Sequence, residues 1–71
     1  GDNMKTVKIE TEYIKLDQFL KWIRIADSGS HAKVLIAEGL VSVNGQIEKR
    51  RGKKLRKGDT VEIFDNIYQI E

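Results

Sequence analysis

Apolar and polar residues alternate along the first stretch of the chain. In residues 5–14, KTVKIETEYI, Val7 and Ile9 fall on one side, and polar or charged residues separate them. Because successive side chains of a β-strand point to opposite faces, this alternation predicts a short strand. The many polar residues in the same stretch favour a position at the edge of a sheet.

From Leu16 onward the apolar residues recur with the period of a helix. Asp17 suits the first turn of that helix, where a negative charge is favourable. Ser28 is a good N-cap for a second helix, and Gly39 fits the left-handed position after its last turn. Only a few residues separate the two helices, so they must fold back on each other or cross closely. The apolar stripes are formed by Leu16, Phe19, Leu20 and Ile23 in the first helix and by Ala32, Leu35 and Ile36 in the second.

After Gly39 the pattern returns to short strands separated by turns. Asn44-Gly45 is the strongest hairpin signal in the chain and predicts a type I′ turn. Residues 57–59, KGD, predict a turn before the strand TVEIF, and Asp65-Asn66 predicts another before IYQI. The predicted fold class is therefore α+β, with two packed helices followed by a small, mostly antiparallel sheet with hairpins.

Length and composition restrict the class of protein. A chain of 71 residues suffices for one domain, close to the lower limit for a single core. The absence of cysteine excludes disulfides and thiolate metal sites. No apolar run is long enough for a membrane span, and no signal-peptide pattern opens the chain. We expect one cytoplasmic domain over residues 1–71 without metal or cofactor, in which residues 1–3, before Met4, are an expression remnant.

The segment KRRGKKLRK, residues 49–57, holds seven cations in nine positions and is called the basic run below. The rest of the chain has 6 Lys and Arg against 11 Asp and Glu, so positive charge is concentrated in this segment. Seven neighbouring like charges repel one another in a domain whose stability is about 5 kcal/mol, and a polyanion removes that penalty. Gly52 permits close approach of a phosphate, while Arg50 and Arg51 offer forked donors. The alternative is a solvated loop that only aids solubility.

The start of the second predicted helix is another candidate anion site. The backbone N–H groups of Ser28, Gly29 and Ser30 carry partial positive charge, and Gly29 has no side chain to block an approaching phosphate. Lys33 lies about one turn further along and could serve the same site. Simple capping by Ser28 explains the sequence equally well. His31 has no visible partner, and we expect it at the surface rather than as a ligand or base.

Trp22 and Tyr68 could stack on an unpaired nucleic-acid base, as aromatic side chains do in RNA-binding proteins. Trp22, however, sits beside the apolar stripe of the first helix. We therefore expect it to be partly buried in the core, and the same reasoning applies to Tyr13.

Catalysis finds little support in the sequence. The chain has one His, no Cys and no GxxxxGK phosphate loop, and a domain of this size has little room for a water-excluding pocket. Glu10 and Glu12 have the spacing of an exposed strand face. We therefore expect a protein that is not an enzyme.

Three separately spaced motifs resemble a known RNA-binding family. They are KLDQFL, SGSHAKVLIAEGLVSVNG and LRKGDTVEI, within residues 15–64. They are similar to the domain first named from protein four of the small ribosomal subunit (the S-four domain, or alpha-L motif). Among its members, the chain looks most like the small stand-alone YaaA-like bacterial branch. Two positions depart from the usual pattern, because Lys15 stands where Arg is common and Gly29 where many members have Arg.

The resemblance implies a non-catalytic module that binds structured RNA, such as ribosomal RNA, through its phosphates. It also places the Asn44 hairpin beside RNA. We expect the basic run to fold back beside the start of the second helix, in a monomer that binds no membrane and no small-molecule substrate. A DNA-binding module and an adaptor that docks an acidic protein remain as alternatives. The candidate RNA-binding residues are Lys15, Lys21, Ser28, Gly29, Ser30, Lys33, Asn44, Arg50, Arg51, Lys53 and Lys54.

Overall fold

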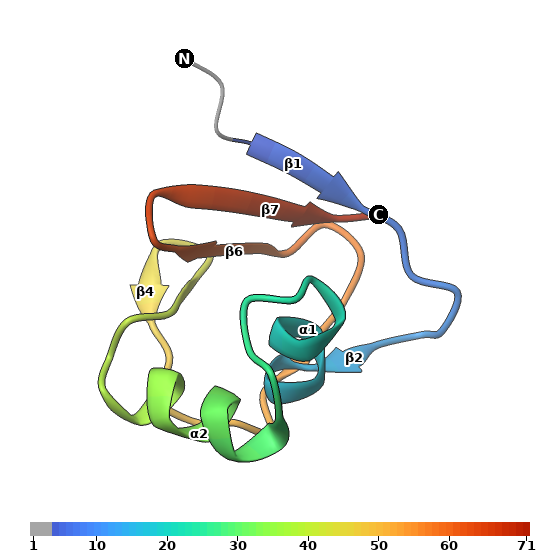
Figure 1. Ribbon diagram of the computed structural model, residues 1–71. Coiled ribbons are helices and arrows are strands. Elements are labelled where there is room, and N and C mark those ends of the chain that lie inside the picture. Colours follow the sequence, from blue (N-terminus) through green and yellow to red (C-terminus); the bar gives the residue numbers. More distant parts are fainter. Residues whose placement is uncertain (1–3) are drawn as a thin grey trace.

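The computed structural model describes residues 4–71, so residues 1–3, expected to be a remnant, lie outside the described residues. Two helices and seven short strands make up the fold, shown in Figure 1. In chain order they are β1 (Met4–Val7), β2 (Ile14–Lys15), α1 (Leu16–Trp22), α2 (Gly29–Ala37), β3 (Ser42–Val43), β4 (Gln46–Ile47), β5 (Lys54–Leu55), β6 (Thr60–Ile63) and β7 (Asn66–Ile70).

The strands form a five-stranded sheet in the order β1-β7-β6-β3-β4 and a separate two-stranded sheet of β2 and β5. All pairs are antiparallel except β1 with β7, which is parallel. In Figure 1 the β1-β7-β6 layer lies above the two helices. The predicted α+β class, with a mostly antiparallel sheet beside two helices, is confirmed.

The first predicted strand is confirmed as an edge strand but is shorter than expected. β1 ends at Val7, and the chain returns to strand geometry only at Ile14. Ile9 lies between the two strands, yet its side chain is buried and its N–H donates to the carbonyl of Glu71 at 2.9 Å. The polar residues 10–12 then leave the sheet. The alternating pattern therefore correctly identified the buried side of the segment but not its break.

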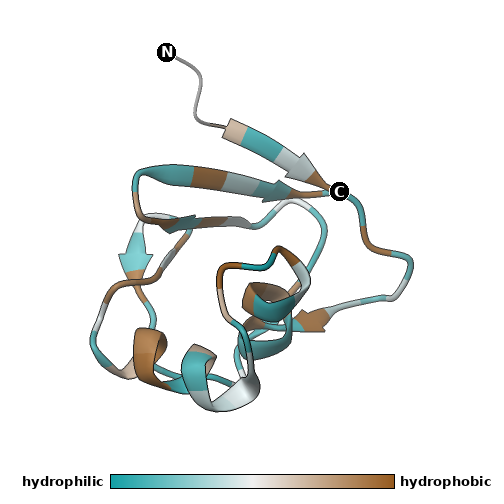
Figure 2. Ribbon diagram, viewed as in Figure 1, coloured by the Kyte–Doolittle hydropathy of each residue, from teal (hydrophilic) through white to brown (hydrophobic). Residues whose placement is uncertain are grey.

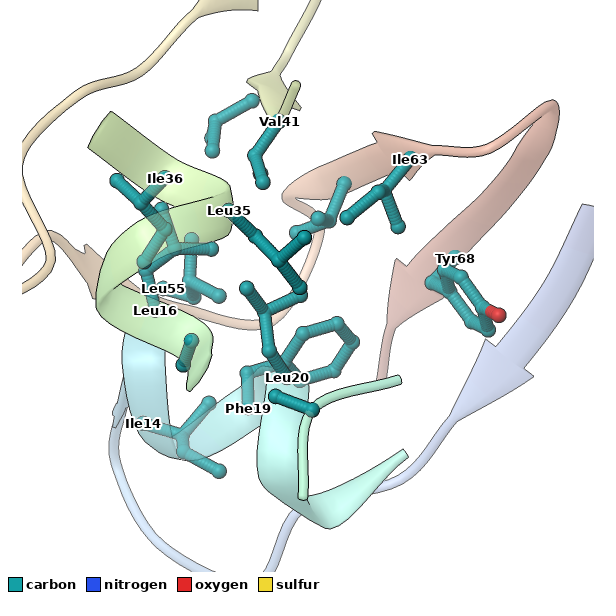
Figure 3. Close-up of a cluster of buried hydrophobic side chains, with 14 of the residues drawn as sticks. Ile14, Leu16, Phe19, Leu20, Leu35, Ile36, Val41, Leu55, Ile63 and Tyr68 are labelled. Carbon is teal, nitrogen blue, oxygen red and sulfur yellow. The ribbon is translucent and has the colours of Figure 1, made fainter. Parts of the chain in front are cut away.

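The core lies between the sheet and the helices, where side chains from both layers point toward one another (Figure 3). Along β7 the buried residues Tyr68 and Ile70 alternate with half-buried ones, as expected for a strand with one buried face. Figure 2 shows hydrophobic residues in β7 and in both helices. Tyr68 of β7 is buried, and its ring meets Phe19 edge to face at 6.0 Å between centroids. Tyr68 is therefore a core residue and offers no surface for stacking. Helix residues in the core are Leu16, Phe19, Leu20, Ala32, Leu35 and Ile36.

The two hairpin turns differ in how well the sequence predicts them. Asn44 and Gly45 have φ angles of 52° and 84°, and the predicted type I′ hairpin between β3 and β4 is confirmed. The predicted turn at Asp65-Asn66 is shifted by one residue, because Phe64 and Asp65 occupy the loop with φ angles of 51° and 66°. The register is fixed at the other end of the hairpin, where Ile70 exchanges backbone hydrogen bonds with residues 58 and 59.

Both helices end in the same left-handed motif, but with different residues at its centre. After α1, Arg24 has a φ of 64°, and the N–H of Ile25 reaches back to the carbonyl of Leu20 at 3.1 Å. After α2, Gly39 takes the equivalent place with a φ of 76°, as predicted. Glycine adopts this conformation without a steric penalty, whereas arginine does not.

Replacing Arg24 with Gly should therefore stabilise the fold. The left-handed conformation destabilises a residue with a side chain by about 1–2 kcal/mol. Glycine avoids this strain, but its greater entropy in the unfolded chain offsets about 0.5–1 kcal/mol of the gain. We expect a net gain of about 0.5–1 kcal/mol in the free energy of unfolding, measured by denaturant titration. Gly39→Ala is the matched control and should lose a similar amount, and an unchanged or reduced stability of Arg24→Gly would contradict the argument.

Candidate nucleic-acid interface

The basic run is attached to the first turn of α1 through its backbone. The N–H of Leu16 donates to the carbonyl of Lys53 at 2.8 Å, and the N–H of Asp17 donates to the carbonyl of Arg51 at 3.0 Å. In Figure 1 the yellow-to-orange chain between β4 and β5 passes behind both helices. Because the first amides of a helix have no acceptor within it, these carbonyls satisfy them.

The pairing of β2 with β5 then brings two lysines together. Ile14 lies opposite Leu55, and both are buried, while Lys15 lies opposite Lys54, and both are exposed. Directly opposed side chains share a face, and like charges in that position are destabilising. The fold therefore holds two candidate residues side by side in an arrangement that an anion would relieve.

An open hollow next to this pair is lined by cations. Its volume is about 430 Å³, and its lining residues are Arg50, Gly52, Lys53, Lys54 and Arg56. We call it the basic hollow. A Cβ atom at Gly52 would meet nothing within 4 Å, so a ligand can approach the backbone closely there. Four cations around one hollow create a positive local potential, which attracts anions such as phosphate.

Arg50 already has an acidic partner inside the chain. Glu48 accepts hydrogen bonds from the Arg50 Nε at 2.9 Å, Nη2 at 3.1 Å and backbone N–H at 3.0 Å. The Glu48 side chain is 14% exposed and that of Arg50 is 75% exposed. The hydrogen bonds from the Arg50 side chain lower the pKa of Glu48 from 4.5 to about 2, with a smaller contribution from Lys53, although burial acts in the opposite direction.

The Glu48–Arg50 pair should make stability depend on acid pH. Since the pKa of Glu48 is lower in the folded state than in the unfolded state, its contribution is complete above about pH 4.5 and is lost as pH falls toward 2. Glu48→Gln should lower the melting temperature at pH 7, and its difference from the unmodified protein should shrink below pH 4.5.

Arg50→Ala provides the control for this pair. Adding Glu48→Gln to Arg50→Ala should change the melting temperature less than Glu48→Gln does alone, because the partner is already absent. A pH-independent difference, or full additivity of the two substitutions, would show that the pair does not account for the effect.

The start of α2 is capped as predicted. Ser28 Oγ accepts from the N–H of His31 at 3.1 Å, and His31 Nδ1 in turn accepts from the N–H of Asp27 at 3.1 Å. His31 is exposed, as expected, and its role here is to close the cap. Open space surrounds Gly29, where an added Cβ would meet nothing within 4 Å. Lys33 is exposed on the same helix.

The contacts of the basic run differ from those expected. Within residues 4–71, no hydrogen bond or ion pair connects Ser28–Ser30 with the run. Instead the run contacts the start of α1, and the side chain of Lys49 lies against Gly39 at the end of α2. The expected position beside the start of α2 stays a prediction, whereas the contact with α1 was missed.

Asn44 has a structural task that uses its side-chain amide. Its Nδ2 donates to the carboxylate of Asp59 at 3.1 Å, and its Oδ1 accepts from the N–H of Thr60 at 2.9 Å. These bonds tie the β3–β4 hairpin to the turn before β6. The hydrogen-bonding groups of this candidate are therefore occupied within the fold.

The expectation that Trp22 is partly buried in the core is wrong, because its side chain is 60% exposed. Successive helix residues are about 100° apart, so Trp22 falls well to one side of the stripe that faces the core. Tyr13 is 36% exposed, and Lys54 Nζ lies 4.9 Å from the centre of its ring. The guanidinium of Arg56 lies 5.8 Å from the same ring. Arg56 was missed as a candidate because only the β2–β5 pairing reveals this contact.

The sequence from residue 7 to residue 71 matches the S4 domain. The chain belongs to the S4 domain family. Its resemblance to the S-four domain is thus confirmed. The solution structure of YbcJ from Escherichia coli, described as revealing an alphaL motif involved in RNA binding, has a TM-score of 0.66 to this S4 domain at 30% identity, covering 99% of this chain and 87% of that one.

The sequence relatives are of two kinds: small proteins that align over most of their length, and an enzyme that aligns over a small part of it. The probable ribosome maturation protein RlbA of Bacillus subtilis is 47% identical over 57 residues, 80% of each chain, and the putative RNA-binding protein YbcJ of E. coli is 36% identical over 58 residues, 82% of this chain and 83% of its own. An uncharacterised RNA pseudouridine synthase of Aquifex aeolicus is 43% identical over 54 residues, which are 76% of this chain but only 17% of that enzyme.

The described part of this S4 domain offers no assembled metal site. Within residues 4–71, no group of three or more His, Cys, Asp or Glu side chains is placed to hold a metal ion. Neither of the two helices there has the length and hydropathy that crossing a membrane requires.

Proposed function

We propose that this S4 domain is a non-catalytic RNA-binding module that grips structured RNA through its phosphates. The basic hollow is the observation that carries the proposal. Its cations lie next to the opposed pair Lys15 and Lys54, on a segment held in place by backbone hydrogen bonds to α1. A charged surface fixed in this way loses little conformational entropy when an anion binds.

The proposed contacts divide into three groups. Lys15, Lys53 and Lys54 form the centre, with Arg50 oriented by Glu48 and Arg51 in the same run. Lys21 extends the surface along α1, and its side chain is exposed. A second phosphate would bind the amides at residues 28–30, with Lys33 beside them. Asn44 would contribute only through the shape of its hairpin, since its amide is engaged.

The relatives support this proposal and suggest which RNA is bound. One is named a putative RNA-binding protein, and another a probable ribosome maturation protein. We therefore propose ribosomal RNA, on a ribosome or an assembly intermediate in the cytoplasm, as the partner of a monomeric domain. The enzyme among the relatives shares only a stretch equal to 17% of its length, so its chemistry is not carried over.

Recognition would depend on RNA shape more than on sequence. Side chains cannot enter the deep major groove of A-form RNA, and phosphate contacts carry no direct sequence information. A clamp built from lysines and arginines would select folds that present several phosphates at matching distances. Dependence on RNA shape distinguishes the proposal from a DNA-binding module. Such a module would contact phosphates at the spacing of B-form DNA, which has no 2′-hydroxyl groups.

The salt dependence of binding tests the grip itself. If about six phosphates are neutralised, log affinity should fall against log salt with a slope of about −4 to −5. The measurement is fluorescence anisotropy of a labelled RNA hairpin in increasing salt. A slope of about −1 would rule out the grip, and a DNA duplex of equal length that competes as well as RNA would favour the DNA-binding alternative.

Lys15→Glu should raise the stability of the fold but lower its affinity for RNA. An acid opposite Lys54 replaces cross-strand repulsion with attraction, so the free energy of unfolding should rise by about 0.5–1 kcal/mol. RNA affinity should fall about tenfold, and the salt slope should become smaller by about 1. Melting curves and the same anisotropy assay measure the two effects.

Lys5→Glu is the matched control, because it changes the net charge equally on β1, in the other sheet. It should lower RNA affinity much less than Lys15→Glu does. If both substitutions weaken RNA binding equally, the binding surface is not centred on the β2–β5 pair.

A further inference from the structure

Two exposed aromatic side chains border one groove beside the basic hollow. The groove has a volume of about 820 Å³ and lies between the segment that leads into β2 and the outward face of α1. Tyr13 and Ile14 line it from the first side, and Gln18, Lys21 and Trp22 from the helix. Neither ring belongs to the buried core, and Trp22 is 60% exposed and Tyr13 is 36% exposed.

We propose that this groove holds an unpaired nucleobase of the RNA, stacked on Trp22 and bordered by Tyr13. The inference rests on the proposed function and adds to it a site for a base, where the basic hollow provides sites for phosphates. Aromatic rings bind bases through stacking, and the indole ring offers the largest such surface among side chains.

The Tyr13 ring connects the groove with two cations of the basic hollow. Lys54 and Arg56 line that hollow, and both also lie within 6 Å of the Tyr13 ring centre, at 4.9 and 5.8 Å. An RNA strand whose phosphates sit in the hollow would therefore pass directly beside Tyr13. Lys21 lines the groove itself and can meet the phosphate on the other side of the flipped base.

The charge of the groove favours a base over another phosphate. Glu12 lines it together with the aromatic rings. A carboxylate repels a phosphate, but it accepts hydrogen bonds from the N–H groups of a base edge. Gln18 adds an amide that can both donate and accept. The groove thus combines stacking surface, base-edge partners and a neighbouring cation.

The platform is also held in place before a ligand arrives. Thr11 Oγ1 donates to the carbonyl of Tyr13 at 2.8 Å, which fixes the approach to β2. Ile14, the residue after Tyr13, is buried in the core and so anchors this segment. On the helix, Gln18 and Trp22 are one turn apart and share a face. The backbone on both sides of the groove is therefore held in place before a base arrives.

The test compares two RNA hairpins with equal numbers of phosphates. One carries a single unpaired nucleotide bulged from its stem, prepared with each of the four bases in turn, and the other carries an abasic site at the same position. At least one base should bind about tenfold more tightly than the abasic RNA. It should also quench the fluorescence of Trp22, the single tryptophan of the chain.

Variants assign the preference to the groove. Trp22→Ala should remove the tenfold difference between the base-bearing and abasic RNAs, and Trp22→Phe should restore part of it. Phe64→Ala should leave the difference intact, because Phe64 is 55% exposed on the β6–β7 turn and does not line the groove. Circular dichroism checks that each variant is folded.

The outcomes distinguish this site from the grip on phosphates. Equal binding of all the base-bearing RNAs and the abasic RNA, with a steep salt dependence and unquenched Trp22, overturns the base site and leaves the phosphate grip intact. A preference that survives in Trp22→Ala also overturns it, because the base then stacks elsewhere. If no RNA binds at all, the proposed function fails and the base site fails with it.

Discussion

The two backbone hydrogen bonds between the basic run and α1 are the contacts on which the rest of the interface depends. The first amides of α1 need acceptors, and Lys15, the residue before the helix, provides no side-chain cap. The carbonyls of Arg51 and Lys53 take that role. The need of a helix end for acceptors therefore fixes the position of the most highly charged segment of the chain. The β2–β5 pair then follows directly and brings Lys54 opposite Lys15.

This attachment has an electrostatic cost that points to an anionic partner. The start of a helix carries a partial positive charge, and the fold places a segment with seven cations against it. Asp17 in the first turn and solvent screening reduce the repulsion but do not remove it. A phosphate backbone would remove more of it than either. The free energy stored as repulsion in the free protein would then contribute to binding, and this is why Lys15→Glu is expected to move stability and affinity in opposite directions.

Local signals in the sequence were sufficient wherever a residue's own backbone geometry decides the structure. The Ser28 cap, the left-handed Gly39 and the Asn44-Gly45 turn are all examples. Features that depend on distant partners were not accessible. The sequence identified Lys15 and Lys54 as candidates, but only the β2–β5 pairing shows that they meet. Arg56 and the exposed groove were missed. Trp22 was misjudged because its closeness to the apolar stripe in sequence says little about the direction of its side chain.

Glu48 keeps the start of the basic run ordered while leaving Arg50 accessible. By binding both the backbone and the guanidinium of Arg50, it fixes the point at which the basic run begins its turn toward α1. Since Arg50 remains 75% exposed, the pair can still be approached by a phosphate. An acid at this place offsets one positive charge and fixes the orientation of Arg50. The proposed interface is thus arranged by intramolecular contacts before RNA arrives, so its affinity would depend on how well phosphates fit those positions rather than on the number of cations alone.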